Sequence, residues 1–493
     1  MNTILIYPKF PDTFWSFKHA LKFISKKATH PPLGLLTIAA MLPDNYEKKL
    51  VDMNVTPLKD SDLNSVDLVF ISAMVIQKRS VSEVIERCRK KGLRIVAGGP
   101  LFTTEPEKFE CVDHLILNEA EITFPVFLED FKKGIAKHIY STDKFADIEK
   151  SPVPLWNLLN MKKYASMSIQ YSRGCPFNCE FCNITSLFGR IFRTKKTSQI
   201  ISELESLYIN GWRGNLFFAD DNFIGNKRKL KDKLIPAVTK WMKARKYPFS
   251  FSTQASLDLA DDEDLMRSIV NMGLNTVFVG IESPEEKSLS ECNKFQNKDR
   301  DLIASIKKMQ NLGIEVTGGF IVGFDNDSKS IFNAQTDLIQ KSGIITAMVG
   351  LLNAPRGSNL YKRMTKEKRI IGEISGDNVD MSINFIPKLP YDKLIEGYKK
   401  IIQGIYSAKA YNERVKQFFR EFKPNYKFKS HLTYSDIKAL FKSIWFLGII
   451  DSSRIYYWKL LFWTFFNKPR FLRMAVVYSI YGFHFRNVFK NMI

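Results

Sequence analysis

Three cysteines in one short loop are the residues of this chain whose types and spacing point most clearly to chemistry. Cys175, Cys179 and Cys182 follow a predicted strand over residues 166–171, which glycine and proline then end. Thiolates suit soft metal centres, but a structural zinc site needs four ligands and no fourth Cys or His lies nearby. Three thiolates can instead hold three irons of a [4Fe–4S] cluster and leave the fourth iron open to an outside ligand.

The spacing Cys-x3-Cys-x2-Cys, with Phe181 just before the last cysteine, resembles the signature of radical S-adenosylmethionine (SAM) enzymes. In that family the open iron binds SAM, and one electron from the cluster cleaves it to methionine and a 5′-deoxyadenosyl radical. The resemblance implies that Cys175, Cys179 and Cys182 are metal ligands and catalytic residues, and that Phe181 packs beside the adenine. Three unrelated buried cysteines, or part of a zinc knuckle, are the alternatives.

Alternating strands and helices are predicted between residue 166 and about residue 390, and these elements must position the cysteine loop. The β-rich runs lie at residues 166–171, 215–219, 249–254, 276–280, 315–322 and 347–352. Their spacing resembles the partial (β/α)6 barrel of radical SAM enzymes. Active residues are then expected at the carboxyl ends of the strands, as in complete barrels.

Polar residues and glycines of these strands are candidates for binding SAM: Asp220, Asp221, Gln254, Glu282, Gly318 and Asn353. By the resemblance, the two aspartates stand where a Gly-Gly-Glu element receives the SAM ammonium group, a departure that cobalamin-binding members often show. Glu282 would accept ribose hydroxyls, and the other three would contact methionine, ribose or adenine. The alternatives are a helix N-cap for Asp221, a surface carboxylate for Glu282 and relief of crowding for Gly318.

Residues 1–140 also alternate short β-rich runs with amphipathic stretches, which predicts a parallel, doubly wound sheet. Such sheets bind ligands beyond the carboxyl ends of their strands, where the strand order reverses. Three loops with permissive or polar residues are predicted there, at residues 72–77, 98–100 and 118–121. Glycines in the second loop would let the backbone approach a bulky ligand.

A doubly wound domain directly before a radical SAM core resembles the cobalamin-binding subfamily. Pro-Pro-Leu-Gly-Leu at 31–35, Gly-Gly-Pro at 98–100 and Glu-Ala-Glu at 119–121 are similar to its recurring marks. The resemblance implies that cobalamin binds at the strand ends, with Ser72, Gly98 and Gly99 as candidate contacts.

The cobalamin domains of mutases carry Asp-x-His-x-x-Gly, whose His coordinates cobalt from below. Here Asn54 stands in place of that His and Pro57 in place of the Gly. If cobalamin binds, we therefore expect no protein His on its lower face. The departure also leaves open that the domain has lost the cofactor.

Composition places the chain in a reducing compartment. Six cysteines, three of them in one loop, argue against a disulfide framework. Residues 1–7 predict a strand rather than a signal peptide, and no apolar run approaches the roughly 20 residues that span a bilayer. The formal charge of +22 is compatible with nucleic acid, an anionic membrane or an acidic electron donor as partner, or with a generally Lys-rich composition.

The C-terminal segment from about residue 431 is aromatic and basic. Residues 431–493 contain nine Lys or Arg, two Asp or Glu and three of the seven Trp. This composition suits an interfacial helix pair on an anionic membrane surface, or a helical cap whose aromatic faces pack on the barrel. A helical module after such a core resembles that of the cobalamin-binding radical SAM enzymes related to hopanoid methylases, whose substrates are membrane lipids.

Together, these patterns predict an α/β protein with a C-terminal helical domain. The expected parts are a Rossmann-like cobalamin-binding domain (1–140), a linker (141–165), a radical SAM core (166–390) and a helical domain (391–493). Of the remaining candidate ligands, Cys88, Cys111 and Cys292 are expected to be ordinary core or surface residues. We assign no role to His30, His114 or His484.

The implied function is cobalamin-dependent C-methylation of an unactivated carbon on an apolar, lipid-like substrate. One SAM would methylate cobalamin, and the radical from a second SAM would remove a hydrogen from the carbon that then takes the methyl group. The alternatives are a radical cyclisation or rearrangement without methyl transfer, and a non-catalytic metal protein that binds nucleic acid. A methylthiotransferase is disfavoured because residues 1–150 contain only two cysteines, too few for a second cluster.

The expected partners are the small-molecule or lipid substrate and a reduced flavodoxin or ferredoxin as electron donor, with no nucleic acid. We expect the protein in the cytoplasm, with peripheral contact to the inner membrane surface through residues 431–493.

Overall fold

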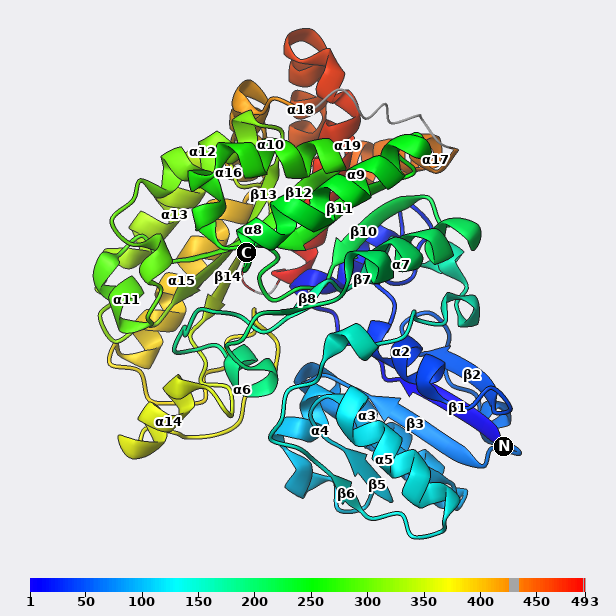
Figure 1. The fold of residues 1–493 in the computed structure, drawn as a ribbon. Helices are drawn as coiled ribbons and strands as arrows, with labels where there is room; N and C mark the ends of the chain where they lie inside the picture. The colour runs from blue at the N-terminus through cyan, green and yellow to red at the C-terminus, as the bar shows by residue number, and fades with distance from the viewer. Residues whose placement is uncertain (425–433, 491, 493) are drawn as a thin grey trace.

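Two parallel β-sheets, one in each half of the chain, organise the computed structural model (Figure 1). The structure describes residues 1–424, 434–490 and 492. Residues 431–433, 491 and 493 of the predicted aromatic and basic segment lie outside the described residues.

The N-terminal sheet has six parallel strands in the order β2-β1-β3-β4-β5-β6. They are β1 Asn2–Tyr7, β2 Glu47–Asp52, β3 Leu68–Ser72, β4 Arg94–Gly98, β5 His114–Ile116 and β6 Ile139–Tyr140. The order reverses between β1 and β3, as in doubly wound folds, so the Rossmann-like prediction is confirmed. Strand β6 was not predicted, because two residues carry no periodic signal.

Helices cover both faces of this sheet: α2 Leu33–Met41, α3 Lys78–Lys90, α4 Pro100–Thr104 and α5 Ala120–Lys132. The short helix α1 Lys18–Leu21 instead contacts the C-terminal helix α19 Leu472–Val488. In α3, Val81, Val84, Ile85 and Cys88 recur at helical spacing and are buried against the strands. Cys88 is therefore a core residue, as expected, and Cys111 is exposed.

The second sheet also has six parallel strands, in the order β14-β13-β12-β11-β10-β7. They are β7 Ser166–Ile169, β10 Gly214–Phe218, β11 Phe249–Gln254, β12 Leu274–Glu282, β13 Glu315–Val322 and β14 Ala347–Leu351. Strands β7 and β14 are its two edges, so the partial (β/α)6 barrel is confirmed. Strand β12 extends two residues past its predicted end, which makes Glu282 its last residue.

The surrounding helices are α7 Thr197–Ile209, α8 Lys227–Lys229, α9 Ile235–Ala244, α10 Glu263–Met272, α11 Glu286–Glu291, α12 Leu302–Asn311 and α13 Ile331–Ser342. Side chains that face these helices are buried, as at Val277 and Val279 of β12. Between β7 and α7, a small hairpin joins β8 Ser172–Arg173 to β9 Arg193–Thr194. The cysteine loop and the short helix α6 Ile184–Phe188 lie inside this hairpin connection.

After β14 come α14 Asn359–Lys366, α15 Tyr391–Tyr406, α16 Ala408–Glu421, α17 Tyr434–Ser443, a π-helical segment Ile444–Ile450, α18 Arg454–Asn467 and α19 Leu472–Val488. Helix α15 covers the edge strand β14. Its Tyr398 and Tyr406 hydroxyls donate to the carbonyls of Val349 and Ala347 at 3.1 and 2.7 Å. These bonds satisfy backbone groups that an edge strand otherwise leaves open.

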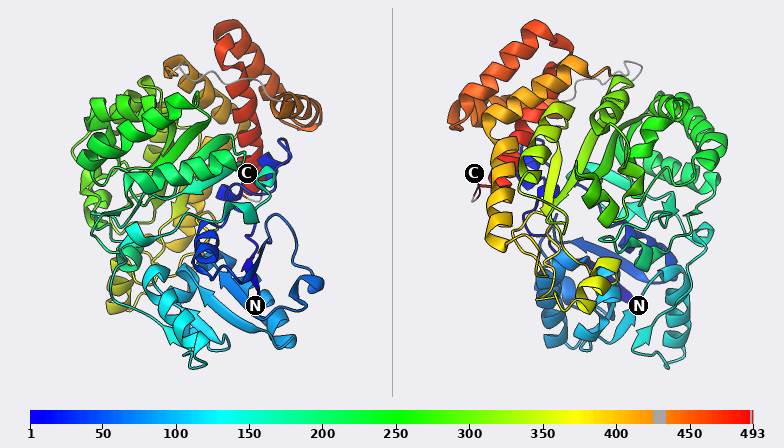
Figure 2. Two further views of the ribbon diagram at one scale, coloured as in Figure 1. Left: turned by 45° about the vertical axis from the view of Figure 1, so that its right-hand side comes forward. Right: turned by 90° about the vertical axis from the view of Figure 1, so that its left-hand side faces the viewer.

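The C-terminal helices differ in what they bury. Helices α15, α16 and α19 pack aromatic side chains into the main core, as the cap alternative predicts. In contrast, α17, the π-helical segment and α18 stand at the end of the molecule away from the N-terminal sheet (Figure 2) and expose large apolar side chains. Within the described residues, no helix is long and apolar enough to cross a membrane.

Buried ion pairs join the N-terminal domain to the hairpin that carries the cysteine loop. Arg173 donates to both carboxylate oxygens of Glu121 at 2.8 Å and to Glu119 at 3.2 Å. Arg193 donates to both oxygens of Glu119 at 2.7 Å. The two carboxylates are 1% and 5% exposed, and bidentate pairs of this kind fix orientation as well as distance.

Replacing Arg173 with Met should loosen this interface, because Glu121 would stay buried without its partner cation. We expect a cost of about 3 kcal/mol or more in stability, with faster proteolysis within residues 141–165. Chemical unfolding and limited proteolysis measure the two effects. Arg190→Met is the control, because this exposed arginine of the same hairpin donates to the Pro176 carbonyl at 3.3 Å and forms no ion pair with a described residue. Equal behaviour of the two variants would contradict a clamping role.

Candidate functional site

The three cysteines lie together at the carboxyl end of β7, between β8 and α6. Cys179 is buried, and Cys175 and Cys182 are half-buried. Burial, followed by the charges of the neighbouring Cys179 and Cys175, raises the pKa of the Cys182 thiol to about 12. The thiols are therefore close enough to feel one another's charge, and a positively charged metal centre would relieve this repulsion.

The donor set fits a cluster better than a single ion. Among the residues that the structure describes, no group of three or more His, Cys, Asp or Glu is arranged to hold one metal ion. In a [4Fe–4S] cluster each thiolate binds a different iron, so the ligands need not converge on one point. Three coupled thiols on one loop suit that arrangement.

Glu180, which lies between the second and third cysteines, braces the loop from outside. Its carboxylate accepts two hydrogen bonds from Arg363 of α14, at 2.6 and 2.9 Å. Its carbonyl accepts from Leu360 N at 2.8 Å, and its own N–H donates to the Cys292 carbonyl at 2.9 Å. The loop is thus fastened to α14 and to the end of α11.

The two predicted aspartates have different surroundings. Asp220 is 1% exposed and accepts hydrogen bonds from the backbone of Tyr171 (3.2 Å) and from the backbone and hydroxyl of Ser172, so it holds the start of the hairpin. Asp221 accepts one bond, from Gly174 N at 3.1 Å, and remains half-buried. Burial raises its pKa to about 6. Of the two carboxylates, Asp221 is therefore the one with free acceptor capacity beside Cys175.

Glu282 forms a buried ion pair at the end of β12. Its Oε1 atom lies 2.8 Å from Lys294 Nζ, and both residues are less than a tenth exposed. Burial lowers the pKa of Lys294, but Glu282 and Cys179 raise it more, so the net shift is upward. The lysine therefore links the candidate ribose-binding carboxylate to the cysteine loop through its charge.

The strand end around this pair is irregular. Its register with β13 shifts between Gly280 and Glu282, and Glu282 has a positive φ of 66°. A Cβ atom at Gly280 would lie 2.9 Å from Lys294 Nζ and even closer to the Glu282 carboxylate, so a side chain there would displace the ion pair. The Glu282 carbonyl accepts from Gln335 at 3.1 Å. These contacts hold a conformation that costs energy, as is common at functional sites.

The remaining predicted SAM residues are spread around this centre. Phe181 packs in an apolar cluster with Phe324 and Cys292. Gln254 ends β11 and makes no side-chain hydrogen bond to the described residues. Asn353 donates to Ser382 O at 3.1 Å and accepts from Asn384 N at 3.2 Å, which ties down the segment after α14.

Gly318 lies in the middle of β13, where a Cβ would meet the Phe320 ring at 2.7 Å. The structure therefore gives this glycine a packing role. Its predicted contact with SAM stays untested.

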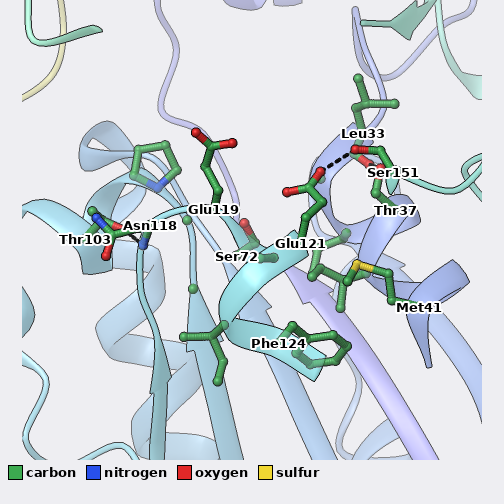
Figure 3. A pocket seen from close by; sticks show the side chains of 18 of the residues that line it. Leu33, Thr37, Met41, Ser72, Thr103, Asn118, Glu119, Glu121, Phe124 and Ser151 are labelled. Atoms are coloured by element: carbon green, nitrogen blue, oxygen red, sulfur yellow. Dashed lines mark hydrogen bonds between the residues drawn. The ribbon is translucent and has the colours of Figure 1, made fainter. Parts of the chain in front are cut away.

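A cavity of about 260 Å³ lies where the N-terminal sheet faces the barrel (Figure 3). The ends of β3, β4 and β5, together with α2, form its walls, and Gln170, Arg173 and Lys195 of the barrel close it. Its lining is mostly apolar and includes the polar residues Ser72, Asn118, Glu119 and Glu121. This is the place where doubly wound sheets bind ligands.

The candidate cobalamin contacts lie on this cavity. Gly98 and Gly99 both line it, and Gly99 has a positive φ of 98°. A Cβ there would come within 2.7 Å of Ser72 Oγ, and one at Gly98 within 2.7 Å of the Ile116 carbonyl. Both glycines are therefore required by the close packing of the strand ends that line the cavity. Their predicted contact with cobalamin stays untested.

Asn54 does not line this cavity. It accepts a bond from Phe10 N at 2.8 Å and donates to Asp52 and to the Pro8 carbonyl, at 2.8 and 3.2 Å. Its side chain is therefore engaged in holding the β2 loop. The expectation that this position supplies no lower ligand to cobalt stays a prediction.

Several residues of the site were not predicted from the sequence, because no motif or spacing marks them. Lys294 and Cys292 follow α11 without a motif, and only the fold brings them to Cys179 and Glu282. His30, which received no role, lies on the inner side of the barrel with Nδ1 3.4 Å from Ser168 Oγ. Arg173 stands two residues before the first cysteine, so its position in that motif was the one available hint.

Replacing Lys294 with Met should destabilise the protein by about 3–5 kcal/mol, because Glu282 would remain buried without a partner. The double variant Lys294→Met/Glu282→Leu should recover most of this loss, and Lys294→Arg should keep the pair. Chemical unfolding of the three variants measures the coupling. A Lys294→Met variant as stable as the parent protein, or a double variant that recovers none of the loss, would rule out a buried ion pair.

Comparison with known proteins agrees with this architecture. Residues 23–128 match the B12 binding domain, residues 169–334 match the radical SAM superfamily, and residues 358–493 match a domain of unknown function, DUF4070. A solved structure of OxsB, described as a cobalamin-dependent SAM radical enzyme, has a TM-score of 0.61 at 14% identity and covers 100% of this chain and 79% of its own. At that identity it supports the fold alone.

Two relatives align over nearly the whole sequence. The uncharacterized methyltransferase sll1242 of Synechocystis sp. is 36% identical over 98% of this chain and 91% of its own length. The hopanoid C-2 methylase of Rhodopseudomonas palustris is 29% identical over 92% and 88%. With the two matched domains and the cavity that faces the cysteine loop, these relatives show that the chain belongs to the cobalamin-dependent radical SAM methyltransferases.

Proposed function

We propose that this enzyme methylates an unactivated carbon of an apolar, lipid-like substrate. The observation that carries the proposal is the position of the cavity. Its walls come from the N-terminal sheet, and Arg173, two residues before the first cysteine, closes it from the barrel side. A methyl donor held there and a radical source held at the cysteine loop would work on the same substrate carbon.

The residues around the loop divide the tasks of binding and orientation. Cys175, Cys179 and Cys182 would hold the cluster, Asp221 would receive the SAM ammonium group, and Glu282 would accept the ribose hydroxyls. When bound, the cluster supplies the electron that cleaves SAM, and cobalamin supplies the methyl group. Lys294 fixes the Glu282 carboxylate, and the ion pairs of Arg173 with Glu119 and Glu121 hold the N-terminal domain over the barrel, which would help to shield a reactive radical from water.

The surface formed by α17, the π-helical segment and α18 supports a substrate reached at a membrane. On α18 the exposed side chains of Ile455, Lys459, Phe462 and Phe466 recur at helical spacing, so the outward face is largely apolar. On α17 the exposed Phe441 lies beside two lysines. An apolar face with basic residues suits the surface of an anionic bilayer.

The similarity to the hopanoid C-2 methylase supports a lipid as the substrate, because a hopanoid is a lipid. We propose that this surface lies on the inner face of the cytoplasmic membrane. The electron comes from a reduced flavodoxin or ferredoxin in the cytoplasm.

Replacing Cys179 with Ala should abolish SAM cleavage while cobalamin binding persists, because the two groups use different domains. The protein is prepared without oxygen, with iron, sulfide and cobalamin supplied, and is then given SAM and dithionite. Iron content, the absorption spectrum and liquid chromatography of the products are measured. Cys111→Ala, which removes an exposed cysteine of the N-terminal domain, is the control.

In the parent protein, S-adenosylhomocysteine together with 5′-deoxyadenosine supports methyl transfer. 5′-Deoxyadenosine alone would favour a radical cyclisation or rearrangement. Failure to bind cobalamin under any condition would remove the methyltransferase mechanism.

Replacing Phe462 and Phe466 with Ser should weaken binding to vesicles of phosphatidylglycerol by about tenfold or more, since each ring would enter the lipid interface. Co-sedimentation measures the bound fraction. Ile209→Ser, which removes an exposed apolar side chain of α7, should leave binding unchanged. Vesicle binding by the parent protein that is absent, or that is unaffected by the double substitution, would contradict this surface assignment.

A further inference from the structure

Helix α14 is fastened directly to the cysteine loop. Leu360 N donates to the carbonyl of Glu180 at 2.8 Å, and Asn359 donates to Asn178 at 3.2 Å. Arg363 binds the Glu180 carboxylate through two bonds. Figure 1 shows α14 beside α6, below the barrel at the lower left of the view. The helix is thus part of the outer wall around the cluster position.

This helix and the turn after it carry a strong positive charge. Residues 359–369 contain five Lys or Arg and one Glu. Two of the five, Arg363 and Arg369, turn inward to Glu180, Glu291 and Asp325 and are neutralised there. The other three, Lys362, Lys366 and Lys368, are exposed. They form no ion pair with any described residue.

Neighbouring cations behave differently. Arg356, which precedes α14, pairs with Glu107. Lys78 and Lys108 of the N-terminal domain share Glu105 and Glu373. Most of the neighbouring cations are therefore neutralised by carboxylates of the protein. Lys362, Lys366 and Lys368, on α14 and the turn after it, instead present their charge to solvent.

We propose that Lys362, Lys366 and Lys368 form the docking surface for an acidic, flavodoxin-like electron donor. The inference rests on the proposed cluster and names where the electron enters. The N-terminal domain covers the barrel mouth on the cavity side, and α14 reaches the cysteine loop through backbone and side-chain bonds from the outside. One electron leaves the reduced flavin of the donor and reduces the cluster by one electron. Complementary charge would orient the donor and speed its encounter.

The test compares two reductants on the reconstituted holoenzyme. Rates of cluster reduction are measured by stopped-flow absorption with reduced flavodoxin and, separately, with dithionite. The variant Lys362→Glu/Lys366→Glu/Lys368→Glu removes the surface. Lys233→Glu/Lys240→Glu/Lys243→Glu changes the net charge equally, at exposed lysines on and just before α9. A second variant with Gln at Lys362, Lys366 and Lys368 removes the charge without reversing it. Circular dichroism and iron content show whether each variant folds and holds its cluster.

The α14 reversal should lower the second-order rate constant with flavodoxin by at least about tenfold at low ionic strength and flatten its salt dependence. Its reduction by dithionite should match that of the parent protein, and the Gln set should show a smaller loss of the same kind. The inference fails if flavodoxin reduces the α14 variant as fast as the parent protein, or if the α9 control slows equally. If dithionite cannot reduce the parent protein, the cluster assignment itself fails instead.

Discussion

The ion pairs of Glu119 and Glu121 with Arg173 and Arg193 are the interaction on which the rest of the site depends. The N-terminal sheet has two apolar cores of its own, and only a few residues of that part of the chain, such as Leu36, join the core of the barrel. Apolar contacts alone would hold the two domains together but would not fix their orientation relative to each other. Bidentate carboxylate–guanidinium pairs specify one orientation, and their burial makes separation costly because each charge would lose its partner. The cavity is thereby held against the cysteine loop.

Ion pairs also position residues within the barrel. Lys294 fixes Glu282 at an irregular strand end, and Arg363 fixes Glu180 between two cysteines. In each case a buried charge is paired and serves to position a neighbour. Charges without such partners lie where a ligand or another protein would meet them: Asp221 beside the first cysteine, and the three lysines on the outside of α14. Charged groups that hold the site together are therefore paired within the protein, and the unpaired charged groups are the candidates for binding a ligand or another protein.

The C-terminal helices differ in whether their apolar side chains are buried or exposed. Helices α15, α16 and α19 bury theirs against the barrel, and two tyrosines of α15 complete the hydrogen bonds of an edge strand. Helix α18 turns Ile455, Phe462 and Phe466 outward. The helical cap therefore describes α19, whereas α18 presents an exposed apolar face whose contact with a membrane stays a prediction. Composition alone could not divide the segment, because the helices share the same residue types.

The sequence by itself determined the parts of this protein that are encoded locally. The cysteine spacing, the alternation of strands and helices, and the glycines at the strand ends can all be recognised within a few residues, so the two sheets and the cluster loop were predictable. Only the tertiary structure decided that Asp220 holds the backbone while Asp221 is left free, that Glu121 meets Arg173 across 52 residues, and that Glu180 meets Arg363 across 183. Those contacts join residues whose separation along the chain carries no periodic signal. They arise from the packing of whole elements, and packing exists only once the chain has folded.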